Sequence, residues 1–216
     1  MAHGRTEDCS DGTRGTPSAL VLAAGPSSRF GGPKPLAELQ GKPLIEWVLD
    51  AIPRAKVKET VVVLGRDAEV VAGAIGRRRG VRCVANRDYP EGMASSIRVG
   101  LSALARGTDG VLVLLADQPL VSRQLLLQLL SIFERATTTV IVAASSHKTV
   151  APPAIFSKEY VPELNALRGD RGARSVIQSH LDCLVRVEVA AEVIMDIDTP
   201  EDLALARASL QSRESR

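Results

Sequence analysis

Aromatic residues and long apolar runs are scarce in this sequence, and each shortage excludes a class of protein. Phe, Tyr and Trp make up only 3% of the 216 residues, too few for the stacked rings that hold single-stranded nucleic acid. No apolar stretch approaches the roughly 20 residues that cross a bilayer. We therefore expect neither nucleic acid nor a membrane among the partners.

Cysteine and histidine are also few. The cysteines Cys9, Cys83 and Cys183 are odd in number and far apart, which supports neither a disulfide framework nor a cysteine-based zinc site. The three histidines lack the spacing of paired metal ligands. The first 17 residues are polar, with no apolar segment of a secretion signal. These features predict a cytoplasmic protein with free thiols.

Charge and length fit one globular domain. The formal net charge is +2, and hydrophobic residues make up 45%, within the globular range. We expect a disordered leader over residues 1–17, a folded domain over 18–208 and a flexible tail over 209–216. The basic run from Arg77 to Arg79 is typical of a solvated loop, with a contact to phosphate or nucleic acid as the alternative.

Short apolar runs alternate with helical patterns along the chain. Strands are expected at 18–24, 60–64, 81–85, 110–116, 139–144 and 184–189. Helices are expected at 43–50, 67–75, 95–105, 122–136, 161–167 and 172–179, with a last one that begins at Thr199. The pair Pro152-Pro153 should break any regular element at that point of the chain. The alternation predicts an α/β fold, a single Rossmann-like domain whose mostly parallel sheet has helices on both faces.

Ligands of such folds bind beyond the carboxyl ends of the strands, and the loop after Ala24 is the first candidate. It is rich in glycine and small residues, whose N–H groups can point at phosphate oxygens. Arg29 and Lys34 add two positive charges, so the loop suits a triphosphate. A surface turn with chance charges is the alternative. A loop lysine should bury little, so Lys34→Ala is expected to leave folding unaffected.

Carboxylates follow at the ends of two later segments. Asp117 comes directly after the most apolar predicted strand, and its oxygens suit Mg²⁺; a turn carboxylate is the alternative. Asp196 and Asp198 alternate across Ile197, so both face one way in an extended segment. The sequence therefore predicts a metal site that combines Asp117 with an acid near the C-terminal end.

Five segments are similar, in order, to motifs of the MobA-like nucleotidyltransferase family, and most of all to its molybdenum cofactor cytidylyltransferases. They are Leu-Ala-Ala-Gly-Pro-Ser-Ser-Arg-Phe-Gly-Gly-Pro-Lys at 22–34, Asn-Arg-Asp-Tyr-Pro-Glu-Gly-Met-Ala-Ser-Ser at 86–96, Leu-Ala-Asp-Gln-Pro at 115–119, Leu-Arg-Gly-Asp-Arg-Gly-Ala-Arg at 167–174 and Asp-Ile-Asp-Thr-Pro-Glu-Asp at 196–202. The resemblance covers roughly residues 20–206. It implies a fold of the nucleotide-diphospho-sugar transferase type.

The resemblance implies an enzyme of the EC 2.7.7 type. Such an enzyme transfers a nucleoside monophosphate from an NTP to a phosphorylated acceptor and releases pyrophosphate. By this resemblance Arg29, Lys34 and Asp117 are the catalytic residues. Mg²⁺ is the expected cofactor, bound by Asp117 and by Asp198, with Asp196 as the alternative second ligand.

The resemblance also implies a nucleotide pocket near the first two motifs. Its expected members are Leu22, Ala23, Ala24, Gly25, Ser28, Arg29, Lys34, Asn86, Gly92, Ser95 and Ser96. In this family alanine at position 24 accompanies CTP, whereas glycine accompanies GTP, so CTP is the favoured nucleotide. Ser95 and Ser96 could alternatively serve only to cap a helix.

Asp170, Arg171 and Arg174 form the candidate acceptor site, because arginine binds phosphate bidentately; a solvated ion pair at a helix start is the alternative. The cytidylyltransferases usually carry Gly-His-Pro-x-x-Phe, whereas residues 150–156 here lack the histidine. Molybdopterin remains the favoured acceptor, with a sugar or polyol phosphate as the alternative. A transient contact with a molybdoenzyme, or an inactive accessory role for a molybdenum hydroxylase, is also compatible with the sequence.

Overall fold

The structure is a computed structural model that describes residues 14–25, 30–147 and 149–214. The strands of its large sheet are β1 (Ser18–Ala23), β4 (Thr60–Leu64), β5 (Val81–Ala85), β6 (Gly110–Leu115), β7 (Ile141–Ser146), β8 (Thr149–Ser157) and β9 (Leu184–Glu188). The helices are α1 (Leu44–Ala51), α2 (Ala68–Ile75), α3 (Met93–Ala103), α4 (Arg123–Arg135), α5 (Val161–Ala166), α6 (Ala173–Ser179) and α7 (Pro200–Glu214). None of the described helices combines the length and apolar character that a membrane crossing needs.

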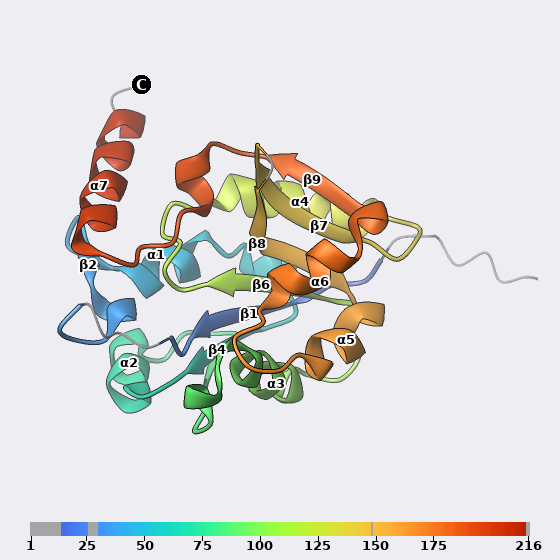
Figure 1. Cartoon of the computed structure of the whole chain (residues 1–216), viewed down its shortest axis with the longest axis horizontal. Helices are drawn as coiled ribbons and strands as arrows, with labels where there is room; N and C mark the ends of the chain where they lie inside the picture. Colours follow the sequence, from blue (N-terminus) through green and yellow to red (C-terminus); the bar gives the residue numbers. More distant parts are fainter. Residues whose placement is uncertain (1–13, 26–29, 148, 215–216) are drawn as a thin grey trace, which may run out of the picture.

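The seven strands lie in the order β5-β4-β1-β6-β8-β7-β9. The first four are parallel, β8 runs antiparallel to both of its neighbours, and β9 pairs parallel with β7. The α/β prediction is therefore confirmed, with a mixed rather than uniformly parallel sheet. Because β1, β4 and β6 are parallel neighbours, their carboxyl ends meet at one edge, on the side where α7 lies (Figure 1).

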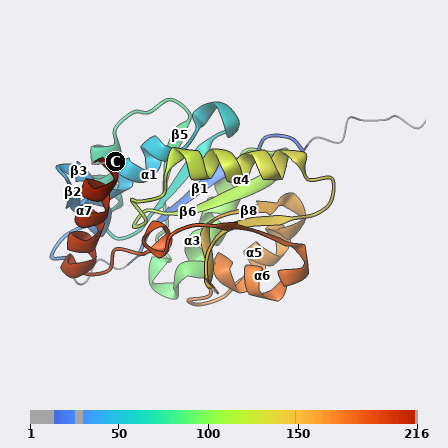
Figure 2. The same cartoon turned by 90° about the horizontal axis from the view of Figure 1, so that it is seen from above.

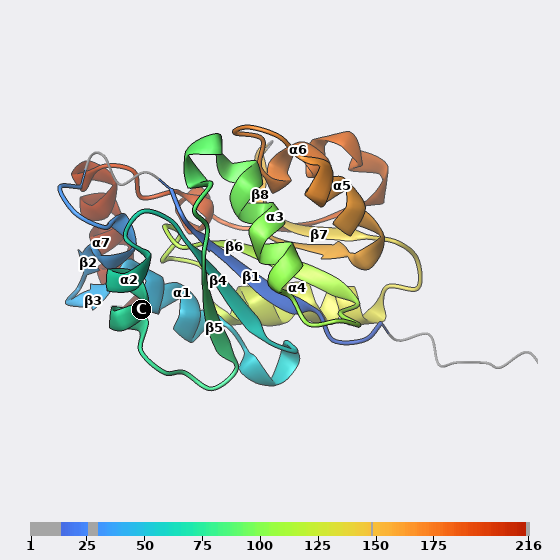
Figure 3. The same cartoon turned by 90° about the horizontal axis from the view of Figure 1, so that it is seen from below.

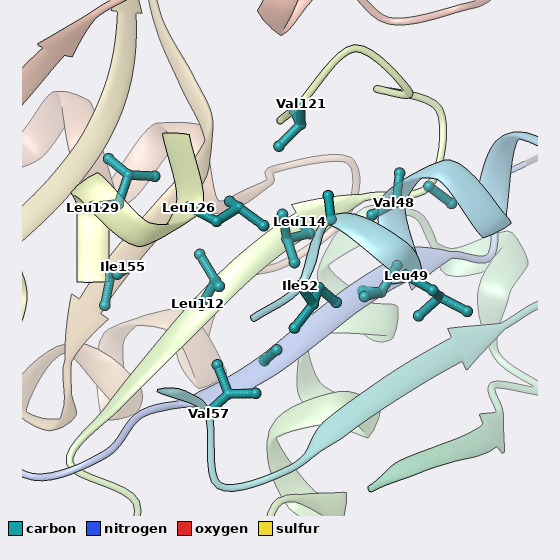
Figure 4. Packing of buried hydrophobic residues seen from close by; sticks show 14 of the residues in the cluster. Val48, Leu49, Ile52, Val57, Leu112, Leu114, Val121, Leu126, Leu129 and Ile155 are labelled. Atoms are coloured by element: carbon teal, nitrogen blue, oxygen red, sulfur yellow. The ribbon is translucent and has the colours of Figure 1, made fainter. Parts of the chain in front are cut away.

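Helices cover both faces of the sheet, as Figures 2 and 3 show from opposite sides. Residues of α1, α2 and α4 pack on one face, and residues of α3, α5 and α6 pack on the other. Leu112 and Leu114 of β6 meet Leu126 and Leu129 of α4 on the first face (Figure 4). Alternate residues of each central strand are thus buried on opposite faces, as expected for strands read as continuous apolar runs.

The prediction that Pro152 and Pro153 break regular structure is wrong, because both lie inside β8. Ala154 pairs with Ala143 of β7 and Ala151 pairs with the next residue, Ala144. The two prolines therefore form a bulge with no partner opposite them. The extra residues of a bulge do not donate backbone hydrogen bonds to the neighbouring strand, so proline, which has no N–H, is tolerated there.

A short hairpin was not expected from the sequence. Its strands β2 (Glu38–Leu39) and β3 (Lys42–Pro43) are antiparallel. Gln40 and Gly41 between them both have positive φ, 52° and 74°, as a two-residue primed turn requires. The hairpin lies beside α7 (Figure 1). Around it is a small apolar group, here called the end cluster, whose buried members are Leu39, Leu44, Leu120, Ile197 and Ala206.

The ends of the domain differ from the expected boundaries. Helix α7 continues to Glu214, so the boundary expected at residue 208 falls inside a helix. Residues 1–13 of the expected leader lie outside the described residues. Two of the four that follow are hydrogen-bonded to the domain: Arg14 N donates to the Glu134 carbonyl at 3.1 Å, and the Pro17 carbonyl accepts from Lys58 N at 2.9 Å.

Candidate active site

A cleft of about 710 Å³ opens beyond the carboxyl ends of β1 and β6, where an α/β fold is expected to bind its ligand. The candidate residues that line it are Leu22, Ala24, Gly25, Lys34, Gly92, Ser96, Asp117, Asp170, Asp196 and Asp198. All five motif segments therefore contribute to the lining, the segment 167–174 through Asp170. Segments from the middle of the chain (86–96, 115–119 and 167–174) meet segments from both ends of the domain in one cleft.

Lys34 lies at the centre of the charged part of the cleft. It begins a turn of 3₁₀ helix over Lys34–Leu36, and only 16% of its side chain is exposed. Its Nζ is 2.5 Å from Asp117 Oδ2 and 2.7 Å from Asp198 Oδ1. The expectation that this loop lysine buries little is thus wrong, because two carboxylates from distant segments enclose it.

The same environment keeps Lys34 positively charged. Burial lowers the pKa of its ammonium group, but the attraction of Asp117 and the hydrogen bonds to Asp117 and Asp198 outweigh burial. The net effect raises the pKa above its ordinary value. Lys34 is therefore a fixed cation at neutral pH.

Three hydrogen bonds attach the segment from Ile194 to Ile197 to the residues that follow β6. Ile197 N donates to the Asp117 carbonyl at 2.9 Å. The side chain of Gln118, which is buried, donates from Nε2 to Asp196 Oδ1 at 2.9 Å and to the Ile194 carbonyl at 3.3 Å. Sequence reasoning did not select Gln118, although it stands next to Asp117 in the motif.

Asp196 and Asp198 differ in their surroundings. Desolvation of its carboxylate, and then the negative charge of Asp117, raise the pKa of Asp196 to about 6. Asp198 is 57% exposed and contacts Lys34 directly. Asp196 instead contacts Gln118. The contacts therefore pair Asp198 rather than Asp196 with the charged centre.

Asn86, Ser95 and Ser96 form a buried network beside the cleft. Asn86 Nδ2 donates to Ser95 Oγ at 2.8 Å and to Ser96 Oγ at 3.0 Å. Ser95 Oγ donates to the Gly92 carbonyl at 2.8 Å, and Asn86 Oδ1 accepts from Asp88 N at 2.9 Å. Asn86 and Ser95 are thus occupied in shaping the start of α3, and Ser96 is the member of the network that reaches the cleft surface.

Gly92 joins this segment to the one that carries the candidate acceptor residues. Its φ is +101°, and a Cβ there would lie 2.5 Å from both Asp170 Oδ1 and the Gly169 carbonyl carbon. Ala94 N also donates to the Gly169 carbonyl at 3.0 Å. Only glycine permits this approach, which brings Asp170 to the cleft wall.

Several candidate residues do not line the cleft. Ala23, Asn86, Ser95, Arg171 and Arg174 lie outside its described lining. Arg171 and Arg174 are exposed. Ser28 and Arg29 lie outside the described residues. The lining also includes residues that were not selected from the sequence, which are Phe30, Tyr89, Pro90, Met93 and Leu115; all five stand inside the quoted motifs.

The charges of the described lining favour a cationic ligand. Four aspartates face one lysine there, and the buried Asp117 Oδ1 has no hydrogen-bond partner among the described residues. Carboxylate oxygens of this kind fit a hard divalent cation. Within the described part of the chain no three His, Cys, Asp or Glu side chains already form a metal cage; the Lys34 ammonium contacts both Asp117 and Asp198.

The arginine run lies apart from the cleft. Arg78 forms ion pairs with Glu46 at 2.8 Å and with Asp50 at 2.9 Å, which attach the loop before β5 to α1. Arg77 and Arg79 are exposed. The structure therefore gives Arg78 a structural contact, and the phosphate alternative for its neighbours stays a prediction.

Comparison with known proteins agrees with this architecture. Residues 19–184 match the model of the MobA-like NTP transferase domain. The chain belongs to this family. The matched part of the MobA-like domain contains Lys34, Asp117 and the segment around Asn86, whereas Asp196, Asp198 and α7 follow it.

Curated relatives of this MobA-like domain are longer proteins. Over 188 residues the chain is 28% identical to the bifunctional protein GlmU of Sorangium cellulosum, which covers 84% of this chain and 38% of that protein. The chain spans less than two-fifths of the length of each of four GlmU proteins that it matches.

Solved structures share the fold. Rv0371c from Mycobacterium tuberculosis H37Rv, in a complex with manganese, is 26% identical, with a TM-score of 0.74 over 90% of this chain and 100% of that one. The 4-diphosphocytidyl-2C-methyl-D-erythritol synthase of Anaerococcus prevotii is 21% identical, with a TM-score of 0.74 over 93% and 97%. The predicted fold of the nucleotide-diphospho-sugar transferase type is therefore confirmed.

Proposed function

We propose that this protein transfers a nucleoside monophosphate from an NTP to a phosphorylated small-molecule acceptor and releases pyrophosphate. The observation that carries the proposal is the contact of Lys34 with both Asp117 and Asp198. One cation and two carboxylates, brought to the strand ends of a MobA-like domain, suit a triphosphate with its metal ion.

The chemistry is a single in-line displacement. An oxygen of the acceptor phosphate attacks the α-phosphorus, the bond from that phosphorus to the bridging oxygen of the β-phosphate breaks, and pyrophosphate leaves. The acceptor phosphate is already ionised near neutral pH, so no strong general base is required. Lys34, together with Arg29, would hold the β- and γ-phosphates, and catalysis consists of positioning and electrostatic stabilisation.

Asp117 and Asp198 are the proposed ligands of a divalent cation, Mg²⁺ in the cell, and Asp196 is the alternative second ligand. Support comes from the unpartnered, buried Asp117 Oδ1 and from the manganese complex of Rv0371c. When bound, the cation would neutralise charge on the α-phosphate. The ammonium group of Lys34 would then contact the triphosphate in place of these carboxylates.

CTP is the proposed nucleotide. Ala24 lines the cleft, and its methyl group takes space that a glycine would leave to a purine. We expect CTP to be favoured over GTP by about 1–3 kcal/mol, and Ala24→Gly to narrow the gap. Isothermal titration with both nucleotides would measure it, and equal affinities in the parent protein would overturn the choice of CTP.

Molybdopterin is the proposed acceptor, with a sugar or polyol phosphate as the alternative. The proposed acceptor side is the one near Asp170, which lines the cleft; Arg171 and Arg174 follow it in sequence and have exposed side chains. A molybdoenzyme is the proposed transient partner. A site that binds molybdopterin would account for the exposed arginines beside Asp170 and for a contact with a molybdoenzyme.

The decisive experiment is a screen of NTPs and phosphorylated acceptors with detection of released pyrophosphate. Asp117→Asn keeps the shape of the side chain and removes its charge, so turnover should fall about 100-fold or more. Thr108→Ala, remote from the cleft, serves as the matched control and should keep full turnover. An Asp117→Asn enzyme within threefold of the parent would contradict the proposed mechanism.

A further inference from the structure

The exposed carboxylate of Asp198 must be held in one orientation if it is to bind a cation tightly. Its side chain is 57% exposed and stands in the loop between β9 and α7. An exposed loop carboxylate samples many orientations, and each orientation it loses on binding a cation costs free energy. Lys34 contacts Asp198 Oδ1 at 2.7 Å in the ligand-free protein, and further contacts hold the backbone of Asp198 from outside the cleft.

The restraint comes from the first turn of α7. Asp202 Oδ2 accepts hydrogen bonds from Thr199 N at 2.8 Å and from Thr199 Oγ1 at 2.9 Å. Thr199 Oγ1 in turn accepts from Asp202 N at 3.2 Å. This is a reciprocal capping box, in which Thr199 is the cap and Asp202 is the third helical residue. The hydrogen bonds from Thr199 lower the pKa of Asp202, so its carboxylate is ionised.

One hydrogen bond goes beyond what the cap requires. Asp198 N donates to the same Asp202 Oδ2 at 3.0 Å. Asp198 precedes the cap residue, and its own carboxylate faces the cleft. The Asp202 carboxylate therefore holds the backbone of the residue whose side chain contacts Lys34, although Asp202 itself is not part of the cleft lining.

The other side of Asp198 is held as well. Ile197 is fully buried in the end cluster, and its N–H donates to the Asp117 carbonyl at 2.9 Å. Leu203 and Ala206 of α7 pack in the same cluster. Asp198 thus stands between a buried anchor on one side and the Asp202 cap on the other, and both restrain its backbone.

We propose that Asp202 is a positioning residue: it orients the Asp198 carboxylate for the divalent cation without touching that cation or the nucleotide. The inference rests on the proposed function, because it takes Asp198 as a metal ligand. Residues that orient metal ligands commonly change metal affinity by 10- to 100-fold when they are removed. Asp202 would act through the backbone of Asp198 rather than through its side chain.

The test measures Mn²⁺ binding to the free protein by electron paramagnetic resonance, without nucleotide or acceptor. Asp202→Ala should weaken Mn²⁺ binding about tenfold, and Asp202→Asn, which keeps an oxygen acceptor, should stay within threefold of the parent. The matched control is Ser122→Ala, which removes the cap of α4, where Ser122 Oγ accepts from Leu125 N at 3.2 Å. It should lower the melting temperature similarly and leave Mn²⁺ binding unchanged.

The variant Asp198→Ala distinguishes a failure of this inference from a failure of the proposed function on which it rests. If Asp198→Ala binds Mn²⁺ like the parent, Asp198 is not a ligand and the proposed metal site is wrong. If Asp198→Ala weakens binding but Asp202→Ala behaves like Ser122→Ala, the positioning role of Asp202 is overturned and the metal site stands. Should Asp202→Ala fail to fold, Asp202→Ser replaces it, since its short hydroxyl cannot reach Asp198 N.

Discussion

Lys34 is the residue in which stability and proposed chemistry meet. Its ammonium group forms ion pairs with Asp117 and Asp198 in the ligand-free protein. In the complex it would contact the triphosphate. A single side chain therefore balances charge in two states of the site. Its substitution should affect folding and turnover through different partners.

We predict that Lys34→Ala loses about 2–4 kcal/mol of transition-state stabilisation in kcat/KM. In metal-free buffer it should also lose about 1–3 kcal/mol of folding free energy, because partly buried Asp117 is left without its cation. Mn²⁺ should restore stability more in the variant than in the parent. Urea unfolding with and without Mn²⁺ measures this.

The control for Lys34→Ala is Lys42→Ala, which removes a lysine–aspartate pair of similar length, with Lys42 Nζ 2.7 Å from Asp50 Oδ2. That pair lies away from the cleft lining. Lys42→Ala should show neither the loss of turnover nor the response to Mn²⁺. A parallel response of both variants would mean that the Lys34 effect is an ordinary lost ion pair.

Asp196 predicts a pH dependence with a defined sign. Its pKa is raised from 3.8 to about 6, so the folded state holds a proton that the unfolded state has lost. The stability that this proton supplies is complete below about pH 4 and disappears as the pH rises through 6. Asp196→Asn cannot ionise and still accepts from Gln118, so it should gain stability relative to the parent between pH 4 and pH 7.

Urea unfolding of the parent and of Asp196→Asn at several pH values in metal-free buffer measures this difference in the free energy of unfolding. Because Asp196 is exposed, solvent screening should make the difference small. Asp50 is a control of opposite sign. Burial raises its pKa, but Lys42 and Arg78 outweigh burial and lower it. Asp50→Asn should therefore be less stable than the parent at pH 7, with a difference that shrinks as the pH falls. A constant gap for Asp196→Asn would refute the assignment.

Among the elements, the junction of α3 with the segment before α6 depends on one glycine. We predict that Gly92→Ala destabilises the protein by about 3 kcal/mol, from its positive φ and from the close approach to Gly169 and Asp170. Nucleotide affinity should fall with it, because the cleft wall moves. Thermal unfolding and CTP titration provide the two measurements.

Gly73 supplies the comparison for Gly92. It lies in the interior of α2, and a Cβ there would meet nothing within 4 Å. Gly73→Ala should therefore stabilise the protein by about 0.5–1 kcal/mol and leave nucleotide affinity unchanged. If both alanine variants shifted stability in the same direction, the close packing at Gly92 would not be what requires glycine.

At the scale of the whole molecule, the cleft is built from both ends of the domain. Lys34 and Asp198 are 164 positions apart in sequence and are joined by a hydrogen bond. A ligand that binds all of these segments favours the folded state over the unfolded one. Binding should therefore be visible as global stabilisation.

We predict that CTP at about 100 times its dissociation constant, added to protein already saturated with Mn²⁺, stabilises the protein by a further ~2.7 kcal/mol and raises the melting temperature by roughly 5–10 °C. CTP alone should give a smaller shift, since the cation would be missing. Differential scanning fluorimetry measures both, and Asp117→Asn is the control that should respond to neither combination. A full shift with CTP in the presence of a chelator would refute the metal role.

The sequence by itself determined where most strands and helices lie, because apolar periodicity is a local property. The strand expected at 60–64 is β4 without change, and the one expected at 81–85 is β5. The motifs also selected most of the cleft lining, since glycines, aspartates and a lysine stand there at the ends of strands. Gln118 could have been found from its place beside Asp117.

Only the tertiary structure decided which distant side chains meet. The bulge that accommodates Pro152 and Pro153 depends on the register between β7 and β8, which local propensity does not fix. The position of Lys34 between Asp117 and Asp198, and the burial of Asn86 away from the cleft surface, follow from strand order and from the packing of α7 and α3. Those distances are set by the whole core, because no short stretch of sequence contains both partners of the contact.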